Sequence, residues 1–202
     1  MRIFFDVAYR FSDRFAKLVY LNVLWIGFSL MGGVVLGFAP ATMAMFAICR
    51  NWARGDQEGP LVRIFWQKYR AEFWSANAVG GLWTIALAIL ALDRQAIVTH
   101  AHLLPYLTET IFFAGIVLSA VGLLYTGPVF SYYQLASWAV IYYALAIGFT
   151  HPIRTIGMMA GIFGIVLLTK VFPVLGMAMG GSSAAYLISV LVQKALPAPI
   201  IK

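Results

Sequence analysis

Residues 73–92 read FWSANAVGGLWTIALAILAL and contain no aspartate, glutamate, lysine or arginine. Glu72 and Asp93 flank this run, so the uncharged stretch ends sharply on both sides. A helix needs roughly 20 mainly apolar residues to cross the hydrocarbon core of a bilayer. The run therefore predicts one transmembrane helix over 73–92.

The composition of the whole chain agrees with a membrane location. Of 202 residues, 62% are hydrophobic and only 10% are charged, and the mean hydropathy is +0.88. Soluble domains carry about a quarter charged residues, and a chain with so few could not cover its surface in water. These values exclude a soluble globular domain and a disordered chain. The single cysteine, Cys49, excludes an intramolecular disulfide framework.

Proline and glycine residues divide the other charge-free runs. Gly37–Pro40 and Thr126–Pro128 interrupt two runs that are too long for one crossing, and each favours a helix break. Later in the chain, Pro173 and Gly180–Ser183 suggest a helix, a break and a final helix with a serine N-cap. The helices predicted besides 73–92 are 18–36, 41–52, 103–125, 129–149 and two between 155 and 194.

These helices predict an all-α fold. The chain is expected to form a single integral membrane domain over 1–202, a polytopic bundle of about five to seven membrane-embedded helices. Gly37–Pro40 and Tyr125–Pro128 occupy similar places, each after a long apolar helix, which suggests two pseudo-repeated halves. Two such three-span halves would lie in the membrane with opposite topology, because three is odd.

Residues 1–17 differ from the runs that follow, because charged residues are spread along them. Phe4, Ala8 and Phe11 recur at three- and four-residue spacing, as on one face of an amphipathic helix. Charges distributed in this way are not typical of a cleavable signal peptide. We predict an N-terminal interfacial helix that leads into residues 18–53.

Residues 54–70 are predicted to form a basic cytoplasmic loop with an amphipathic helix. Its apolar face contains Leu61, Ile64, Phe65 and Tyr69. Basic residues favour the cytoplasmic side of a membrane. The basic residues of this segment and its approach are Arg50, Arg54, Arg63, Lys68 and Arg70.

The arrangement of residues 18–53 depends on which side of the membrane the N-terminus occupies. An internal N-terminus requires an even number of crossings, which predicts a hairpin turning near Pro40. An external N-terminus predicts one span followed by a short helix on the cytoplasmic surface. The remaining spans are expected in 71–194, with a tail over 195–202.

Several residues within or beside the apolar runs could have a functional role. The asparagines suit hydrogen bonds between helices, and Glu109 suits a hydrated interfacial position more than a proton relay. The long stem of Lys170 can carry its amine to an interface, or the amine can act as an intramembrane charge. The candidates are Asn22, Asn77, Glu109 and Lys170.

Glycine pairs at four-residue spacing, Gly33/Gly37, Gly157/Gly161 and Gly176/Gly180, suit close contact between helices.

A metal site is the less favoured interpretation of His100 and His102 with Asp93 and Glu109. A His-x-His pair in a loop is unspecific, and polar residues commonly solvate such loops. No nucleotide-binding loop or zinc-protease helix motif occurs. The sequence therefore predicts no catalytic residue, no cofactor and no metal ligand.

Several motifs resemble the YesL-like family of bacterial integral membrane proteins, a domain of unknown function. They are Leu21–Trp25, Gly37–Thr42, the Arg50–Gly59 turn, Phe65–Phe73 and Tyr143–Thr155. Residues 30–36 depart from the family pattern, which usually has a Leu-Pro and a threonine there. The resemblance covers nearly the whole chain. It implies a multi-pass protein of the bacterial cytoplasmic membrane, often encoded near sugar uptake systems.

Together these observations favour a non-enzymatic membrane accessory or interaction protein. The resemblance implies association with the permease of a bacterial carbohydrate ABC uptake system, and the glycine-lined helix faces also suit self-association. The expected surroundings are the lipid bilayer, and no nucleic acid is expected, because the basic residues form no contiguous face. The alternative is a small secondary transporter or channel-like protein, for which Asn22, Asn77 and Lys170 would be the relevant residues.

Overall fold

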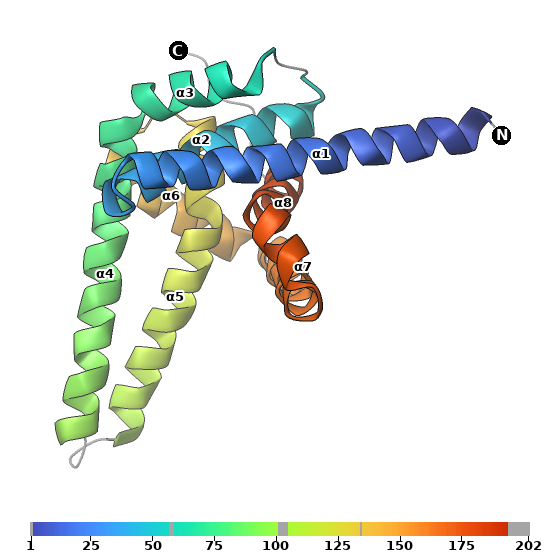
Figure 1. Cartoon of the computed structure of the whole chain (residues 1–202). Helices are drawn as coiled ribbons and strands as arrows, with labels where there is room; N and C mark the ends of the chain where they lie inside the picture. Colours follow the sequence, from blue (N-terminus) through green and yellow to red (C-terminus); the bar gives the residue numbers. More distant parts are fainter. Residues whose placement is uncertain (1, 57–58, 101–104, 134, 194–202) are drawn as a thin grey trace.

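The computed structural model describes residues 2–56, 59–100, 105–133 and 135–193, and the side chains of 12–56, 59–94, 109–133 and 135–193. These residues form eight helices and no strands (Figure 1). The helices are α1 (Arg2–Met31), α2 (Val35–Arg54), α3 (Leu61–Ala71), α4 (Phe73–His100), α5 (Pro105–Tyr132), α6 (Ser137–Thr150), α7 (Pro152–Val171) and α8 (Pro173–Gln193).

Five of the described helices are long and apolar enough to cross a membrane, and α6 is apolar but shorter. This confirms the all-α fold and the predicted helical membrane bundle. The candidate spans are Ser12–Met31, Phe73–Arg94, Glu109–Tyr132, Pro152–Val171 and Pro173–Gln193.

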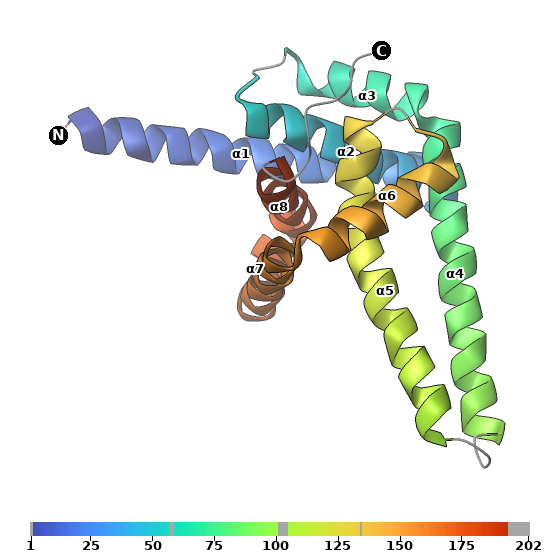
Figure 2. The ribbon, with the colours of Figure 1, turned by 180° about the vertical axis from the view of Figure 1, so that it is seen from behind.

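The helices pair as antiparallel hairpins. α4 and α5 run side by side over most of their length, and α7 and α8 form a second pair (Figures 1 and 2). α1 and α2 lie across one end of the α4–α5 hairpin, and α3 covers the outer side of α2 (Figure 1). α2 contacts α1, α3, α4, α5 and α8, so it is the helix around which the others assemble.

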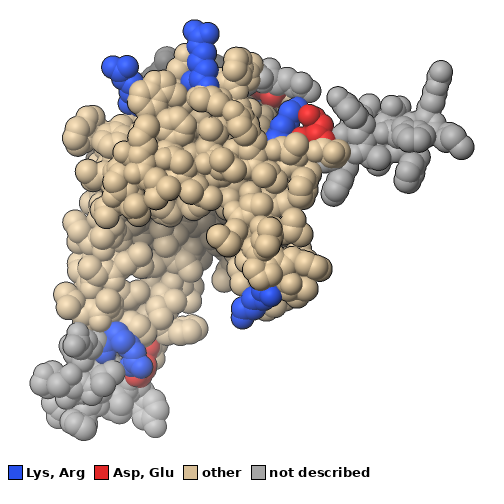
Figure 3. All heavy atoms as spheres, in the orientation of Figure 1, with Lys and Arg blue, Asp and Glu red and all other residues tan. Residues whose placement is uncertain are grey.

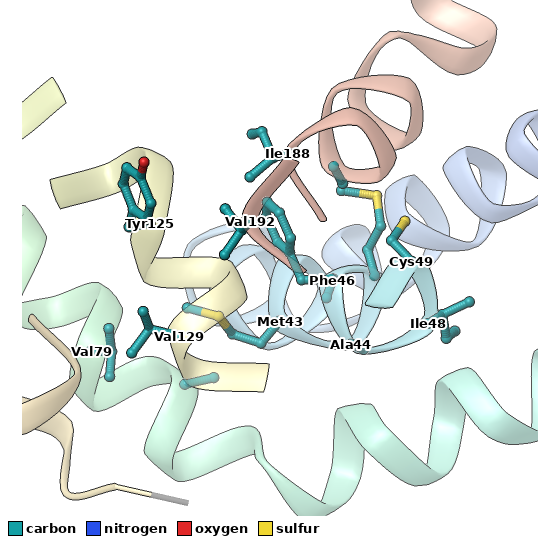
Figure 4. Close-up of a cluster of buried hydrophobic side chains, with 14 of the residues drawn as sticks. Met43, Ala44, Phe46, Ile48, Cys49, Val79, Tyr125, Val129, Ile188 and Val192 are labelled. Carbon is teal, nitrogen blue, oxygen red and sulfur yellow. The ribbon is translucent and has the colours of Figure 1, made fainter. Parts of the chain in front are cut away.

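The core forms around α2 because its middle is apolar on every side. Residues 43–49 are all buried, and Figure 4 shows Met43, Phe46 and Cys49 among side chains of α4, α5 and α8. By contrast, large apolar side chains of α4, α5 and α7 are exposed along the outside. This pattern, apolar outside as well as inside, is that of helices surrounded by lipid.

The turn between α1 and α2 lies at Gly32–Val34, so the predicted break and hairpin turn near Pro40 are wrong. Gly33 has φ +74°, a conformation that glycine adopts readily. Gly32 and Gly37 approach each other so closely that a Cβ on either residue would overlap backbone atoms on the opposite side of the turn. Pro40 lies in α2 near its N-terminus, where a proline disturbs few backbone hydrogen bonds.

Val34 is the strained residue of this turn. Its φ of 62° and ψ of −61° are those of a γ-turn, closed by a 2.7 Å hydrogen bond from the Val35 N–H to the Gly33 carbonyl. Its side chain is 55% exposed and packs little. We expect Val34→Gly to raise the free energy of unfolding by about 1 kcal/mol, because glycine adopts this conformation without the strain. The thermal unfolding midpoint in mild detergent measures this, and an unchanged or lower midpoint would refute the strain.

Two other predicted breaks are also absent. α5 continues through Pro128 to Tyr132, and α8 continues through Gly180–Ser183 without a serine N-cap. Neighbouring helices can satisfy the backbone group that an interior proline leaves free in a membrane helix. The predicted break at Pro173 is confirmed, since α8 begins there.

The N-terminal segment is helical as predicted and is continuous with the first span in α1. Lys17 donates a 2.7 Å hydrogen bond to Asp13 one turn earlier. The side chains of Phe4, Ala8 and Phe11 lie outside the described ones. α3 confirms the second amphipathic prediction, because Phe65 and Tyr69 are buried on its inner face.

On one face of the molecule the charged side chains lie toward its ends (Figure 3). On the face shown in Figure 3, Lys and Arg lie over α3 and at the far ends of α4–α5 and α7. An uncharged band separates these two groups along the α4–α5 hairpin (Figure 3). Such a band between two charged zones is the arrangement that a bilayer requires.

Candidate functional site

A buried polar junction joins α1, α2 and α8. Asn22 of α1 is 2% exposed, and its amide nitrogen donates to the Met177 carbonyl of α8 over 2.8 Å. Its amide oxygen accepts a 3.2 Å hydrogen bond from the Ser182 backbone N–H. Both ends of the Asn22 amide are therefore used between helices, as predicted for an asparagine in an apolar run.

Ser182 extends this junction in two directions. Its hydroxyl donates to the Leu18 carbonyl of α1 over 2.7 Å, and Cys49 of α2 contacts its carbonyl with a sulfur–oxygen distance of 4.0 Å. Gly181 makes the approach feasible, because a Cβ there would lie 2.9 Å from the Asn22 amide oxygen. Nothing in the sequence marks Ser182 as a partner of Asn22.

A second set of polar contacts joins α4, α5 and α7. The Trp83 indole donates to the Thr126 hydroxyl over 2.9 Å. The hydroxyls of Tyr125 and Thr155 lie 3.0 Å apart, and Thr155 also donates to the Gly148 carbonyl at the end of α6. None of these contacts was predicted from the sequence, where the available signal is only a threonine within an apolar run.

The predicted basic residues divide between two helices. Arg50 and Arg54 lie near the C-terminus of α2, where their guanidinium carbons are 5.6 and 4.7 Å from the centre of the Tyr132 ring. Both contacts are within the range of cation–π attraction. Arg63, Lys68 and Arg70 belong to α3, with Arg63 and Arg70 exposed. The basic segment is thus a surface made of the C-terminal end of α2 and the amphipathic helix α3.

Glu72 lies beside this surface, between α3 and α4. Burial raises the pKa of its carboxyl above the usual range, while the positive charges of Lys68 and Arg50 act in the opposite direction. Glu72 thus places a half-buried carboxyl group between the start of the α4 span and the basic surface.

The other candidate residues lie apart from the junction. Asn77 donates to the Phe73 carbonyl one turn back, so its described hydrogen bond is within α4. Glu109 lies 3.4 Å from Arg94, and both side chains are at least half exposed. Lys170 is exposed in the last turn of α7, where a positive charge favours a helix C-terminus.

The residues considered for a metal site are only partly described. Asp93 and Glu109 are exposed, whereas the side chains of His100 and His102 lie outside the described ones. Within the described residues, no group of three or more His, Cys, Asp or Glu side chains could hold a metal ion.

Glycines distinguish helix faces that have a partner from those that do not. A Cβ on Gly122, Gly127 or Gly148 would meet a side chain of a neighbouring helix, and so would one on Gly161. Of the predicted pairs, Gly37, Gly161 and Gly176 lie at such close contacts, whereas Gly33 and Gly157 do not. Gly157 and Gly164 of α7, in contrast, face open space.

Comparisons with known proteins place these features in a family. Residues 18–94 match the family described as "Protein of unknown function, DUF624". Three proteins of Bacillus subtilis (strain 168), each described as an uncharacterized protein, are similar to this chain. YesL is 36% identical over 75% of this chain and 71% of its own length. YesV is 32% identical over 83% and 81%, and YteU is 28% identical over 81% and 73%. No solved structure matches the chain.

Proposed function

This chain belongs to the DUF624 family of YesL-like membrane proteins, and from that premise we propose that it is a non-enzymatic accessory subunit of the bacterial cytoplasmic membrane. Its partner is the permease of a carbohydrate ABC uptake system, and it binds this partner through the open glycine face of α7. The YesL-like resemblance supports the location and the class of partner.

The open glycine face of α7 carries the proposal. Gly157 and Gly164 lie seven residues apart, which places them on one side of the helix. Small residues let two helices approach closely in a membrane, and a Cβ at either position would meet nothing. Only 11% of the α7 span is buried, against 28% of the α5 span. α7 therefore offers the surface that a partner helix would need.

The polar residues that motivate the transporter alternative have other uses. Both the nitrogen and the oxygen of the Asn22 amide form hydrogen bonds with α8. Lys170 is exposed at the end of α7, where its amine reaches the interfacial zone. These placements favour helix packing over a transport path for the two residues.

We expect the tagged chain, purified in mild detergent from cells that produce it natively, to carry a permease subunit with it. Gly157→Leu should reduce the recovered permease at least about tenfold, because a leucine blocks close helix approach. Quantitative mass spectrometry of the purified material measures the recovery.

Val166→Phe is the matched control. Val166 is 47% exposed and lies nine residues from Gly157, on the opposite side of α7. This variant also adds volume to an exposed position, yet it should retain the permease. Wild-type chain that purifies reproducibly alone would contradict the proposal, as would equal losses in the two variants.

A further inference from the structure

An apolar groove of about 560 Å³ lies between the C-terminal part of α1 and α3. The groove is shallow and widely open to its surroundings. The lining residues are Phe28, Met31, Pro60, Val62, Arg63 and Trp66. Arg63 is the only charged residue among them.

Aromatic rings packed against one another form one wall of the groove. The Phe28 ring centre lies 4.9 Å from that of Phe65 and 5.8 Å from that of Trp66. Tyr69 lies behind them, with its ring centre 5.3 Å from that of Phe28. Contacts of this kind hold the rings in place, so the groove is formed before any ligand arrives.

Apolar side chains remain exposed on the open side of the groove. Met31, Val62 and Trp66 are 58%, 43% and 41% exposed. In the same short helix, Arg63 and Arg70 are exposed and point away from the buried face of Phe65 and Tyr69. An amphipathic helix with this pattern lies in the plane of the membrane interface, with its cationic side chains at the level of the lipid headgroups.

The positive charge of Arg63 indicates which kind of ligand would bind in the groove. None of the described acidic residues forms an ion pair with Arg63; the ion pairs among the described residues join Lys17 to Asp13 and Arg94 to Glu109. A guanidinium binds phosphate oxygens with two parallel hydrogen bonds. A cation beside an apolar slot at the interface is complementary to a molecule with an anionic head and a hydrocarbon tail.

We propose that this groove binds one anionic phospholipid of the surrounding bilayer, with an acyl chain against Phe28, Met31 and Trp66 and its phosphate on Arg63. The surface formed by α1 and α3 would therefore bind anionic phospholipids in preference to others. It is independent of any protein partner on α7.

Native mass spectrometry of the full chain tests this site. The chain in mild detergent is titrated with phosphatidylglycerol or with phosphatidylcholine of the same acyl chains. We expect one phosphatidylglycerol to be retained in preference to phosphatidylcholine. Arg63→Gln should weaken phosphatidylglycerol binding about fivefold, the expected effect of one basic residue near anionic lipid.

Two further variants separate the groove from general electrostatic attraction. Arg70→Gln removes the same charge from the same side of α3 but outside the groove, so it should weaken binding less than about twofold. Val62→Phe keeps every charge and fills the open side, so it should weaken binding as Arg63→Gln does.

Equal retention of the two lipids would overturn the site, and so would equal effects of the two arginine variants. Unchanged binding by Val62→Phe would overturn it as well. A dimer that disappears in Val62→Phe, without lipid retention, would assign the groove to a second copy of the chain and would also overturn the proposal.

Discussion

Replacing Gly127 with alanine is expected to lower the free energy of unfolding by about 1–3 kcal/mol, the usual cost of overpacking a core. A Cβ at this position would overlap the ring of Phe46, with atoms 2.5 and 2.7 Å away among those affected. Phe46 is only 8% exposed and belongs to α2, which other helices surround. The ring therefore has no free space into which it can move.

Gly81→Ala is the matched control and should have the opposite sign. Gly81 lies inside α4 and a Cβ there would meet nothing, so alanine should stabilise the helix by about 0.5–1 kcal/mol. Thermal unfolding midpoints in mild detergent, followed by the loss of the monodisperse species, measure both changes. Shifts of the same sign would show that the α2–α5 contact at Phe46 is wrongly placed.

Asn22→Ala is expected to lower stability by about 1–2 kcal/mol. It removes two hydrogen bonds between α1 and α8 and leaves the buried Ser182 backbone N–H without the Asn22 acceptor. Interhelical hydrogen bonds in membrane proteins are often weaker, averaging about 0.6 kcal/mol each, so the effect comes from losing both.

Asn77→Ala serves as the comparison, because Asn77 bonds only to a carbonyl of its own helix in the described structure. Its effect should stay below about 0.5 kcal/mol. The same unfolding measurement applies to both variants. If Asn77→Ala were as costly as Asn22→Ala, the junction of α1 and α8 would have no special role in stability.

Local patterns in the sequence predicted the fold class and the amphipathic helix α3 well. Phe65 and Tyr69 lie four residues apart, so a helix places both on one side, and α3 buries both. The charge-free run over 73–92 was also predicted correctly: it lies within the candidate span of α4, because its length and apolar composition are enough for one membrane crossing.

Helix boundaries were less predictable where prolines and glycines were involved. Pro40 lies near the N-terminus of α2, where a proline disturbs few hydrogen bonds, and Pro128 lies in a membrane helix whose neighbours can satisfy the freed backbone group. At Gly32–Val34 two residues adopt positive φ, and there the chain does turn. Gly180–Ser183 stays helical because Gly181 and Ser182 pack against Asn22 of α1.

The polar junction shows the limit of reading a single sequence. Asn22 stands out in its apolar run, but its partners in α8 are about 155 residues away in the chain, at Met177 and Ser182. Serine and threonine are common in membrane helices, so Ser182 and Thr126 carry no local mark of their contacts. Only the arrangement of the helices identifies which of these residues meet.

The open face of α7 provides the most direct test of the accessory role. A photoreactive diazirine side chain is placed at position 157, or at position 166 on the opposite side of α7, in cells that produce the chain natively. After illumination, position 157 should give a discrete covalent adduct with a permease subunit, and position 166 should give none. Adducts with lipid alone at both positions, or the same proteins at both, would contradict the proposed accessory role.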